Sequence, residues 1–184
     1  MRIITGLAKG HRIKAPKGLK TRPTTDRIKE SLFNIIPDVS NQRVLDLFSG
    51  SGNIGIEFLS RGAEQCYFID NNASSVKIIK ENLKKTDLIK KANVYKNSVD
   101  RAIKILSKKR VVFDIIFLDP PYNKNLVKPT IEEISENNIL SKEGYIIIEH
   151  ESSLNLPEKI SDLVNFDTRK YKDTSISFYR REEG

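Results

Sequence analysis

The stretch Val44-Leu45-Asp46-Leu47-Phe48-Ser49-Gly50-Ser51-Gly52-Asn53-Ile54-Gly55 decides the fold of this 184-residue chain. A short apolar run leads into three glycines spaced as G-x-G-x-x-G, the pattern of a strand, a loop and a helix. Gly50 permits a tight turn, Gly52 lets a ligand approach the backbone, and Gly55 lets the helix pack on the strand. Because many strand-loop-helix turns contain glycine, the pattern gains meaning only from its surroundings.

Two carboxylates supply that context. Asp70 lies 18 residues after Gly52, at the end of the next predicted strand. A carboxylate there can accept both hydroxyls of a ribose, with an ordinary turn role as the alternative. Asp46 stands just before the loop, and its charge opposes a pyrophosphate at the helix N-terminus. It favours a ligand with an ammonium group, such as S-adenosylmethionine, although Asp46 could also cap loop N–H groups.

Strands and helices alternate along most of the chain. This alternation predicts a doubly wound, mostly parallel α/β sheet of seven strands, covered on both faces. The runs 164–169 and 175–180 have no helix between them, which predicts an antiparallel strand near the C-terminus. Residues 2–4 and 11–14 predict a small N-terminal β-hairpin. The other strands are expected at 43–47, 65–70, 92–96, 112–118 and 144–150, and helices at 54–61, 73–85, 99–108 and 129–137.

The second informative stretch is Asp119-Pro120-Pro121-Tyr122, which follows an apolar run. Neither proline can donate to a strand ladder, and each restricts the residue before it, so the strand ends in a stiff, extended loop. Such a loop holds the Asp119 carboxylate and the Pro120 carbonyl as two fixed acceptors beside the Tyr122 ring. This set suits a planar heterocycle with an exocyclic amine, although an isolated Asp-Pro pair usually caps a turn.

The net charge of +8 is unevenly distributed. Residues 1–36 hold nine Lys or Arg and two acids, so they carry +7 while the remaining 148 residues carry +1. A solvated face is the ordinary explanation of a charge run. Here the segregation, and the Gly and Pro between the charges, favour binding of a polyanion.

Several protein classes are not favoured by the composition. No apolar run approaches the roughly 18 residues that a membrane span needs, and no signal-peptide pattern precedes the first polar residues. Cys66 is the only cysteine and there are two histidines, which gives neither a disulfide framework nor a metal site. We therefore expect a cytoplasmic protein. The phosphate-binding motif of nucleotide triphosphatases is missing.

With both motifs in hand, the chain resembles the Rossmann-like S-adenosylmethionine-dependent methyltransferases that act on exocyclic amines. It is similar over essentially its whole length to the bacterial family that methylates the amine N2 of guanine 966 in 16S ribosomal RNA. DNA adenine methylases share the Asp-Pro-Pro-Tyr loop alone. The similarity lies in Arg2-Ile3-Ile4-Thr5-Gly6, Arg22-Pro23-Thr24, Arg27 and Glu30 followed by Phe33, Asp46 to Gly55, Ser60-Arg61-Gly62-Ala63, and Asp119 to Tyr122.

The resemblance implies S-adenosylmethionine as cofactor, and 16S ribosomal RNA or an assembled or partly assembled small subunit as substrate. Ser98 stands where many of these enzymes have an acid for the adenine amine, a bond that a hydroxyl accepts more weakly. The residues assigned to catalysis are Asp119, Pro120, Pro121 and Tyr122. The residues assigned to the cofactor are Asp46, Phe48, Ser49, Gly50, Gly52, Asp70 and Ser98.

We expect two parts, a basic N-terminal arm over residues 1–21 and a methyltransferase domain over 22–184. The arm is expected to contact RNA phosphates, and the protein is expected to be a monomer. Two alternatives stay open: a DNA adenine-N6 methyltransferase, and a non-catalytic RNA-binding assembly factor. The residues assigned to RNA are Arg2, Lys9, His11, Arg12, Lys14, Lys17, Lys20 and Arg22.

Overall fold

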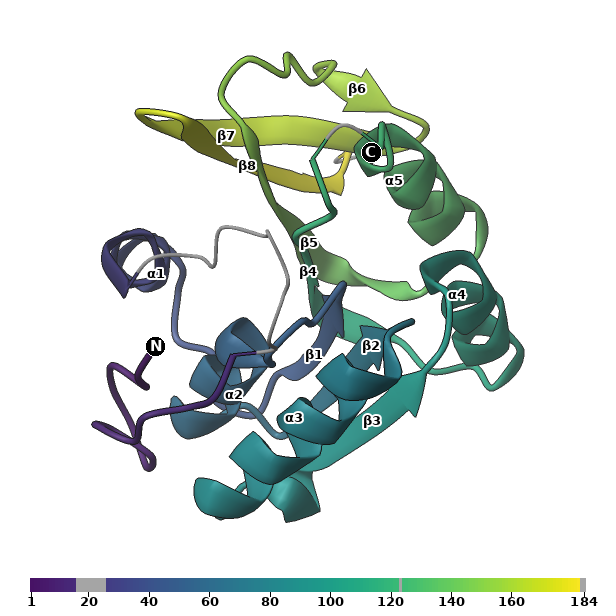
Figure 1. Ribbon diagram of the computed structural model, residues 1–184. Helices are drawn as coiled ribbons and strands as arrows, with labels where there is room; N and C mark the ends of the chain where they lie inside the picture. The colour runs from purple at the N-terminus through teal and green to yellow at the C-terminus, as the bar shows by residue number, and fades with distance from the viewer. Residues whose placement is uncertain (16–25, 123, 183–184) are drawn as a thin grey trace.

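The computed structural model describes residues 1–15, 26–122 and 124–182. Within these residues one sheet of eight strands runs through the molecule in the order β3-β2-β1-β4-β5-β8-β7-β6 (Figure 1). The strands are β1 Arg43–Leu47, β2 Gln65–Asp70, β3 Ala92–Lys96, β4 Phe113–Leu118, β5 Leu140–Glu151, β6 Lys159–Ile160, β7 Leu163–Tyr171 and β8 Thr174–Arg181. The helices are α1 Asp26–Ile35, α2 Asn53–Ser60, α3 Ala73–Lys85, α4 Val99–Lys108 and α5 Val127–Glu136, with a 3-10 turn at Ile89–Lys91.

The doubly wound, mostly parallel sheet predicted from the sequence is confirmed. Strands β1 to β5 pair in parallel, and β8 enters antiparallel beside β5. The predicted tight turn joins β7 to β8, with Lys172 at a φ of 53°. The number of strands was predicted as seven and is eight. The missed strand, β6, has two residues and pairs only with the start of β7, so it is too short for an alternating pattern.

The predicted N-terminal hairpin is present in a short form, with one antiparallel bridge between Arg2 and Arg12 and backbone hydrogen bonds that join Ile3 to His11 and Gly10, and Ile13 to Met1. Other backbone donors of this segment, between the two paired runs, turn toward α2. The N–H groups of Ile4 and Thr5 donate to the Glu57 carboxylate at 2.8 and 3.0 Å. Further along, Leu7 and Ala8 donate to the carbonyl and hydroxyl of Ser60.

Helices cover the two faces of the sheet and divide the apolar core into two clusters. Helices α1, α2 and α3 lie over one face, and α4 and α5 over the other (Figure 1). Alternate residues of β1 show the division, because Val44 packs under the first group and Leu45 under the second. The N-terminal loop belongs to the first cluster through its buried apolar side chains Ile3, Ala8 and Ile13.

Helix α2 has a glycine at each end. Gly52, at a φ of 77°, precedes its first turn, and Gly62, at 105°, follows its last. Gly55 fits tightly against the sheet, because an added Cβ would lie 2.3 Å from the Phe68 ring. No helix in the described ranges has the length and apolar character that crossing a membrane requires.

Candidate active site

The glycine loop and the Asp-Pro-Pro-Tyr loop meet at one edge of the sheet. Strands β1 and β4 are parallel neighbours, with Asp46 opposite Phe117, so the loops at their carboxyl ends lie side by side. The strand order reverses between these two strands, which is where open α/β sheets bind their ligands. A pocket of about 1080 Å³ opens there, and both loops line it.

The pocket gathers nearly all of the residues that the sequence assigned to catalysis and to the cofactor. Gly52 is the exception, because it is not among the lining residues. An added Cβ on Gly52 would meet Ile79 and Ile56 at 3.3 and 3.4 Å, so this glycine serves the packing of α2 and α3. The predicted residues that line the pocket are Asp46, Phe48, Ser49, Gly50, Asp70, Ser98, Asp119, Pro120, Pro121 and Tyr122.

Asp70 fixes the shape of the glycine loop. Its Oδ2 accepts from the backbone N–H of Gly50 at 2.8 Å, and its Oδ1 from Asn72 N at 2.8 Å. Gly50 has a φ of 56°, as a tight turn requires. A carboxylate oxygen accepts more than one hydrogen bond, so Asp70 keeps acceptor capacity toward the pocket that it lines.

Phe48 and Ser49 connect this loop to the neighbouring strand and the core. Phe48 has a φ of 61°, an uncommon conformation for a bulky residue, which places its half-buried ring both in the pocket wall and against the second apolar cluster. The Ser49 hydroxyl donates to the Asp46 carbonyl at 2.6 Å and accepts from Ile69 N at 3.0 Å. The loop is therefore held in place before any ligand binds.

Asp46 is a buried acid, with 2% of its surface exposed. Its Oδ2 accepts from the backbone N–H of Gly55 at 3.1 Å, inside α2. The pKa of Asp46 is raised to about 8, chiefly by burial. The hydrogen bond from Gly55 acts in the opposite direction, and the charge of Asp70 contributes to the rise. A cation placed beside Asp46 would stabilise its charged form.

Two further acids share this face of the sheet. Asp119 follows Phe117 at an interval of two, and Glu149, which is 3% exposed, follows Ile147 in β5 in the same way. Burial raises the pKa of the Asp119 carboxyl above its usual range, and the charges of Glu149 and Asp46 raise it further. We did not select Glu149 from the sequence. The signal that could have identified it is an acid that directly follows the apolar residues of a predicted central strand.

The rest of the Asp-Pro-Pro-Tyr loop projects outward. Pro120 is buried, while Pro121 is exposed and Tyr122 is 37% exposed. Burial of part of the Tyr122 ring raises the pKa of its hydroxyl, with Thr174 acting in the opposite direction through a hydrogen bond. The loop thus presents a carboxylate at the pocket and a partly open aromatic ring beside it.

Ser98 stands directly before α4, with its backbone N–H bonded to Asn97 Oδ1 at 3.0 Å. Its side chain bonds to Asp100, and this bond is the main cause that holds the pKa of the Asp100 carboxyl below its usual range. Asp100 also lines the pocket. An acid therefore lines the pocket two residues after Ser98, in the first turn of the helix.

Asn53 is another pocket residue that the sequence analysis did not select. Its Oδ1 accepts from the ammonium group of Lys29 at 2.8 Å, and the Lys29 Nζ also contacts Glu57 Oε2 at 3.1 Å and the Arg2 carbonyl at 2.5 Å. Lys29 is fully buried. Burial lowers the pKa of Lys29, and Glu57 acts in the opposite direction. One positive charge of the N-terminal 36 residues is therefore withdrawn from the surface.

The other basic residues of the N-terminal loop lie at the surface. Arg2, Lys9, Arg12 and Lys14 are exposed, together with His11, whose Nδ1 lies 2.9 Å from the Ala8 carbonyl. Arg2 pairs with Asp26 at 3.7 Å and Lys14 with Glu81 at 3.0 Å. Lys17, Lys20, Arg22 and the predicted domain boundary lie outside the described residues.

Known proteins carry the same fold and much of the same sequence. YlbH of Bacillus subtilis (strain 168), provisionally named an rRNA methyltransferase, is 43% identical over 98% of this chain and 99% of its own length. Ribosomal RNA small subunit methyltransferase D of Haemophilus influenzae is 33% identical over 98% and 92%. The solved structure of yhhF from Escherichia coli, provisionally titled a methyltransferase, covers 99% of this chain and 98% of its own at 27% identity and a TM-score of 0.85.

The fold and the site together define a Rossmann-like methyltransferase. A family model described as Conserved hypothetical protein 95 matches residues 1–180. The chain belongs to this family, and several of its curated relatives carry the name ribosomal RNA small subunit methyltransferase D. The resemblance seen in the sequence is thereby confirmed.

Proposed function

We propose that the protein is a ribosomal RNA methyltransferase that transfers a methyl group from S-adenosylmethionine to N2 of guanine 966 in 16S RNA. One observation carries the proposal: the glycine loop with Asp46 and Asp70, and the loop with Asp119 and Tyr122, line a single pocket. The names of the relatives support an RNA of the small ribosomal subunit as substrate. An assembled or partly assembled subunit is the proposed form of that substrate.

The chemistry of the pocket fits a cationic cofactor. Besides burial, the charges of Glu149 and Asp46 raise the pKa of Asp119, and the charge of Asp70 raises that of Asp46. A ligand with an ammonium and a sulfonium group relieves this repulsion. In this proposal Asp46 faces the ammonium group, Asp70 accepts from the ribose hydroxyls, and Ser98 or Asp100 accepts from the adenine amine. When bound, the cofactor supplies an activated methyl group.

Asp119 and the Pro120 carbonyl would orient the amine of the target base. A base amine is a poor nucleophile because its lone pair is delocalised into the ring. Acceptors that hold its two hydrogens direct the lone pair and stabilise the positive charge that grows on nitrogen in the transition state. The raised pKa of Asp119 in the unliganded protein would fall again as that charge appears. Proton loss can follow methyl transfer, so no strong general base is required.

Tyr122 would hold the base after it leaves its stack. Its ring is partly open beside the pocket, and stacking on an aromatic ring is worth about 1–3 kcal/mol per base. This offsets much of the few kcal/mol that unstacking a base costs. The exposed cations of the N-terminal loop would bind phosphates and contribute affinity with little sequence information.

Transfer of radiolabelled methyl groups tests the proposal. The substrates are deproteinised 16S RNA and small subunits that lack their modifications, followed by nucleoside analysis. We expect labelled N2-methylguanosine, with one of the two substrates clearly preferred. Cofactor binding without label in either RNA substrate would contradict the proposal.

Two controls separate the alternative functions. Competition with duplex DNA distinguishes the DNA adenine-N6 methyltransferase, which would place the label on adenine. A protein that binds both RNA and cofactor without turnover would be a non-catalytic assembly factor. Light scattering after gel filtration measures the mass in solution, for which we propose a monomer.

A further inference from the structure

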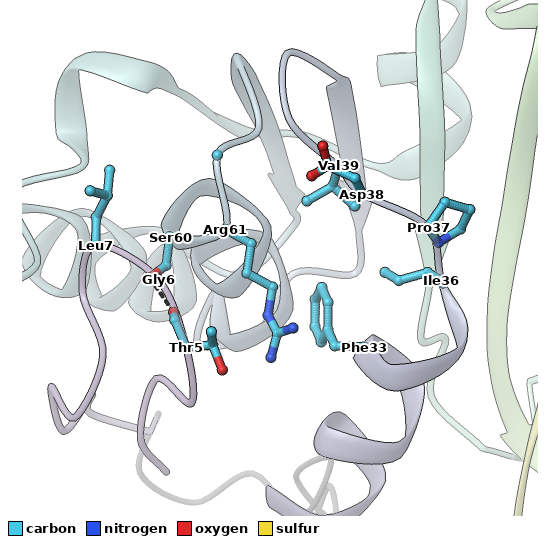
Figure 2. A pocket seen from close by; sticks show the side chains of 11 residues that line it. Thr5, Gly6, Leu7, Phe33, Ile36, Pro37, Asp38, Val39, Ser60 and Arg61 are labelled. Carbon is cyan, nitrogen blue, oxygen red and sulfur yellow. Dashed lines mark hydrogen bonds between the residues drawn. The ribbon is translucent and has the colours of Figure 1, made fainter.

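A second pocket, of about 630 Å³, lies at the other end of α2. Three segments form it: residues 5–7 of the N-terminal loop, residues 33–39 at the end of α1, and residues 60–62 at the end of α2 (Figure 2). It shares no lining residue with the candidate active site. Its volume falls in the range of small-molecule sites.

A guanidinium group is held ready in this pocket. Arg61 Nε donates to Glu57 Oε1 at 2.9 Å, and the guanidinium carbon lies 4.3 Å from the centre of the Phe33 ring. Figure 2 shows the group between Thr5 and Phe33. Its two terminal amino groups make no hydrogen bond to any residue in the described ranges. A guanidinium held in this way can donate a fork of two bonds without further loss of freedom.

The positive charge of Arg61 is not cancelled by its carboxylate partner. Glu57 is fully buried and also pairs with Lys29 at 3.1 Å, so two cations share one anion. Because Lys29 is itself fully buried and surrounded by acceptors, Arg61, the partly exposed member, is the cation that a ligand can reach.

The rest of the pocket offers an acceptor and an apolar wall. Asp38 is exposed, and its Oδ1 accepts from the N–H and hydroxyl of Ser40 at 3.1 and 2.8 Å. These bonds hold the pKa of Asp38 below its usual range, so the carboxylate stays charged. Leu7, which is 76% exposed, and Pro37 supply apolar surface. The pocket therefore combines a fork of donors, a carboxylate and apolar surface on two sides (Figure 2).

We propose that this second pocket binds one unpaired nucleotide of the RNA substrate, with Arg61 on a phosphate, Asp38 on an amine-bearing base edge, and the base against Leu7 and Pro37. The inference rests on the proposed function for the identity of the RNA. The N-terminal loop joins the two sites, because Met1 lines the first pocket and Thr5 to Leu7 the second. Helix α2, with its eight residues, separates the pockets by about 12 Å.

Two substitutions and two matched controls test the site. Arg61→Lys keeps the charge but loses the fork, and Asp38→Asn removes the carboxylate. Arg110→Lys and Glu143→Gln make comparable changes at exposed positions outside both pockets. We expect Arg61→Lys and Asp38→Asn each to raise the dissociation constant for 16S RNA about tenfold, with the constant for S-adenosylhomocysteine unchanged. The controls should stay within twofold. RNA affinity within twofold of wild type in both test variants would overturn the inference.

Photo-crosslinking identifies the occupant directly. A benzophenone amino acid at position 7 stands on the pocket wall, where Leu7 is exposed. Crosslinks to RNA nucleotides near the methylated base support the inference, and crosslinks only to a ribosomal protein overturn it. The outcome is separable from that of the proposed function. A protein that transfers methyl groups but gives no RNA crosslink would keep the function and lose the second pocket.

Discussion

A buried carboxyl group lies at each end of helix α2, and one has cationic partners while the other has none in the described ranges. Toward its C-terminus, the Glu57 carboxylate is surrounded by donors: the side chains of Lys29 and Arg61 and the N–H groups of Ile4 and Thr5. Beside its N-terminus, Asp46 accepts from Gly55 N–H, and no cation pairs with it in the described ranges. A carboxylate that the protein itself pairs with cations serves the fold, while a buried acid without a counter-ion, with its pKa raised, indicates where a cationic ligand binds.

The largest expected effect on stability comes from the end of α2 that holds Glu57, which we call the satisfied end because the protein supplies all the partners of this carboxylate. Glu57→Gln leaves the buried ammonium group of Lys29 without its carboxylate, and we expect the free energy of unfolding to fall by about 3–5 kcal/mol. Glu81→Gln, which breaks the exposed pair with Lys14, is the control and should change little. Denaturant unfolding measures both. Equal effects would mean that the buried network does not stabilise the fold.

The largest expected effect on activity comes from the other end. Asp119→Ala removes the acceptor for the target amine, and we expect methyl transfer to fall about 100- to 1000-fold. Cofactor affinity should change far less than the transfer rate, because Asp46 and Asp70 remain in the pocket wall. Single-turnover transfer rates are the measurement. Activity within a few-fold of wild type would exclude the assigned role.

Two glycines of one loop measure how tightly the satisfied end is packed. Gly6 and Gly10 have similar φ angles, 86° and 83°. An added Cβ would lie 1.8 Å from the Ser60 carbonyl oxygen at Gly6 and would meet nothing within 4 Å at Gly10. Because the backbone strain is shared, Gly6→Ala should destabilise the protein by about 1–3 kcal/mol more than Gly10→Ala. Matching unfolding midpoints would show that the loop is not seated on α2.

Cofactor binding at the Asp46 end of α2, the unsatisfied end, should depend on pH. With a pKa of about 8 in the folded protein, Asp46 must lose a proton to pair with a cationic ligand. Affinity for S-adenosylmethionine should therefore rise with pH from 5.5 to 7, by up to about tenfold per unit, or 1.4 kcal/mol. Asp46→Asn should bind more weakly and lose this slope. Calorimetry in buffers of different ionisation enthalpy measures the released proton, and the same slope in both proteins would refute the assignment.

The same shift makes a prediction for stability. The folded protein retains the Asp46 proton up to about pH 8, whereas the unfolded chain loses it near pH 4. The unfolded state therefore binds fewer protons in this window, and the stability of the unliganded protein falls as pH rises. Asp46→Asn removes this contribution. The free energy of unfolding of the variant, minus that of the wild type, should therefore increase from pH 4 to pH 8. Thermal unfolding across this range tests it.

Local sequence patterns predicted most of the strands and helices around α2. Helix α3 begins and ends where its pattern indicates, because Asn72 caps its first turn by accepting from Ser74 N at 2.8 Å. Strands β1, β2 and β3 also match their predicted bounds. Each of these elements carries its boundary signals within a few residues, and the two site loops follow from the strands that end there.

Features that depend on distant partners were missed for the opposite reason. Lys29 sits among polar residues in the sequence, and its burial depends on Glu57 and Asn53, more than 20 residues away. Glu149 gains its meaning only from the adjacency of β5 and β4. In the same way, the loop at Gly6 is held by acceptors on α2 that its own sequence does not indicate. A local sequence pattern indicates the secondary structure of a segment, but not the distant residues that the segment contacts in the fold.

The bonds that seat the N-terminal loop also bear on how the protein is made. Residues 3–8 leave the ribosome about fifty residues before Glu57 and Ser60, which hold their backbone N–H groups. Closing so long a loop costs entropy before any contact repays it. This segment is made before the residues that bind it, and it should thus be among the last to dock during folding. Pulsed hydrogen exchange would detect this as late protection of Ile4 and Ala8 relative to the central strands.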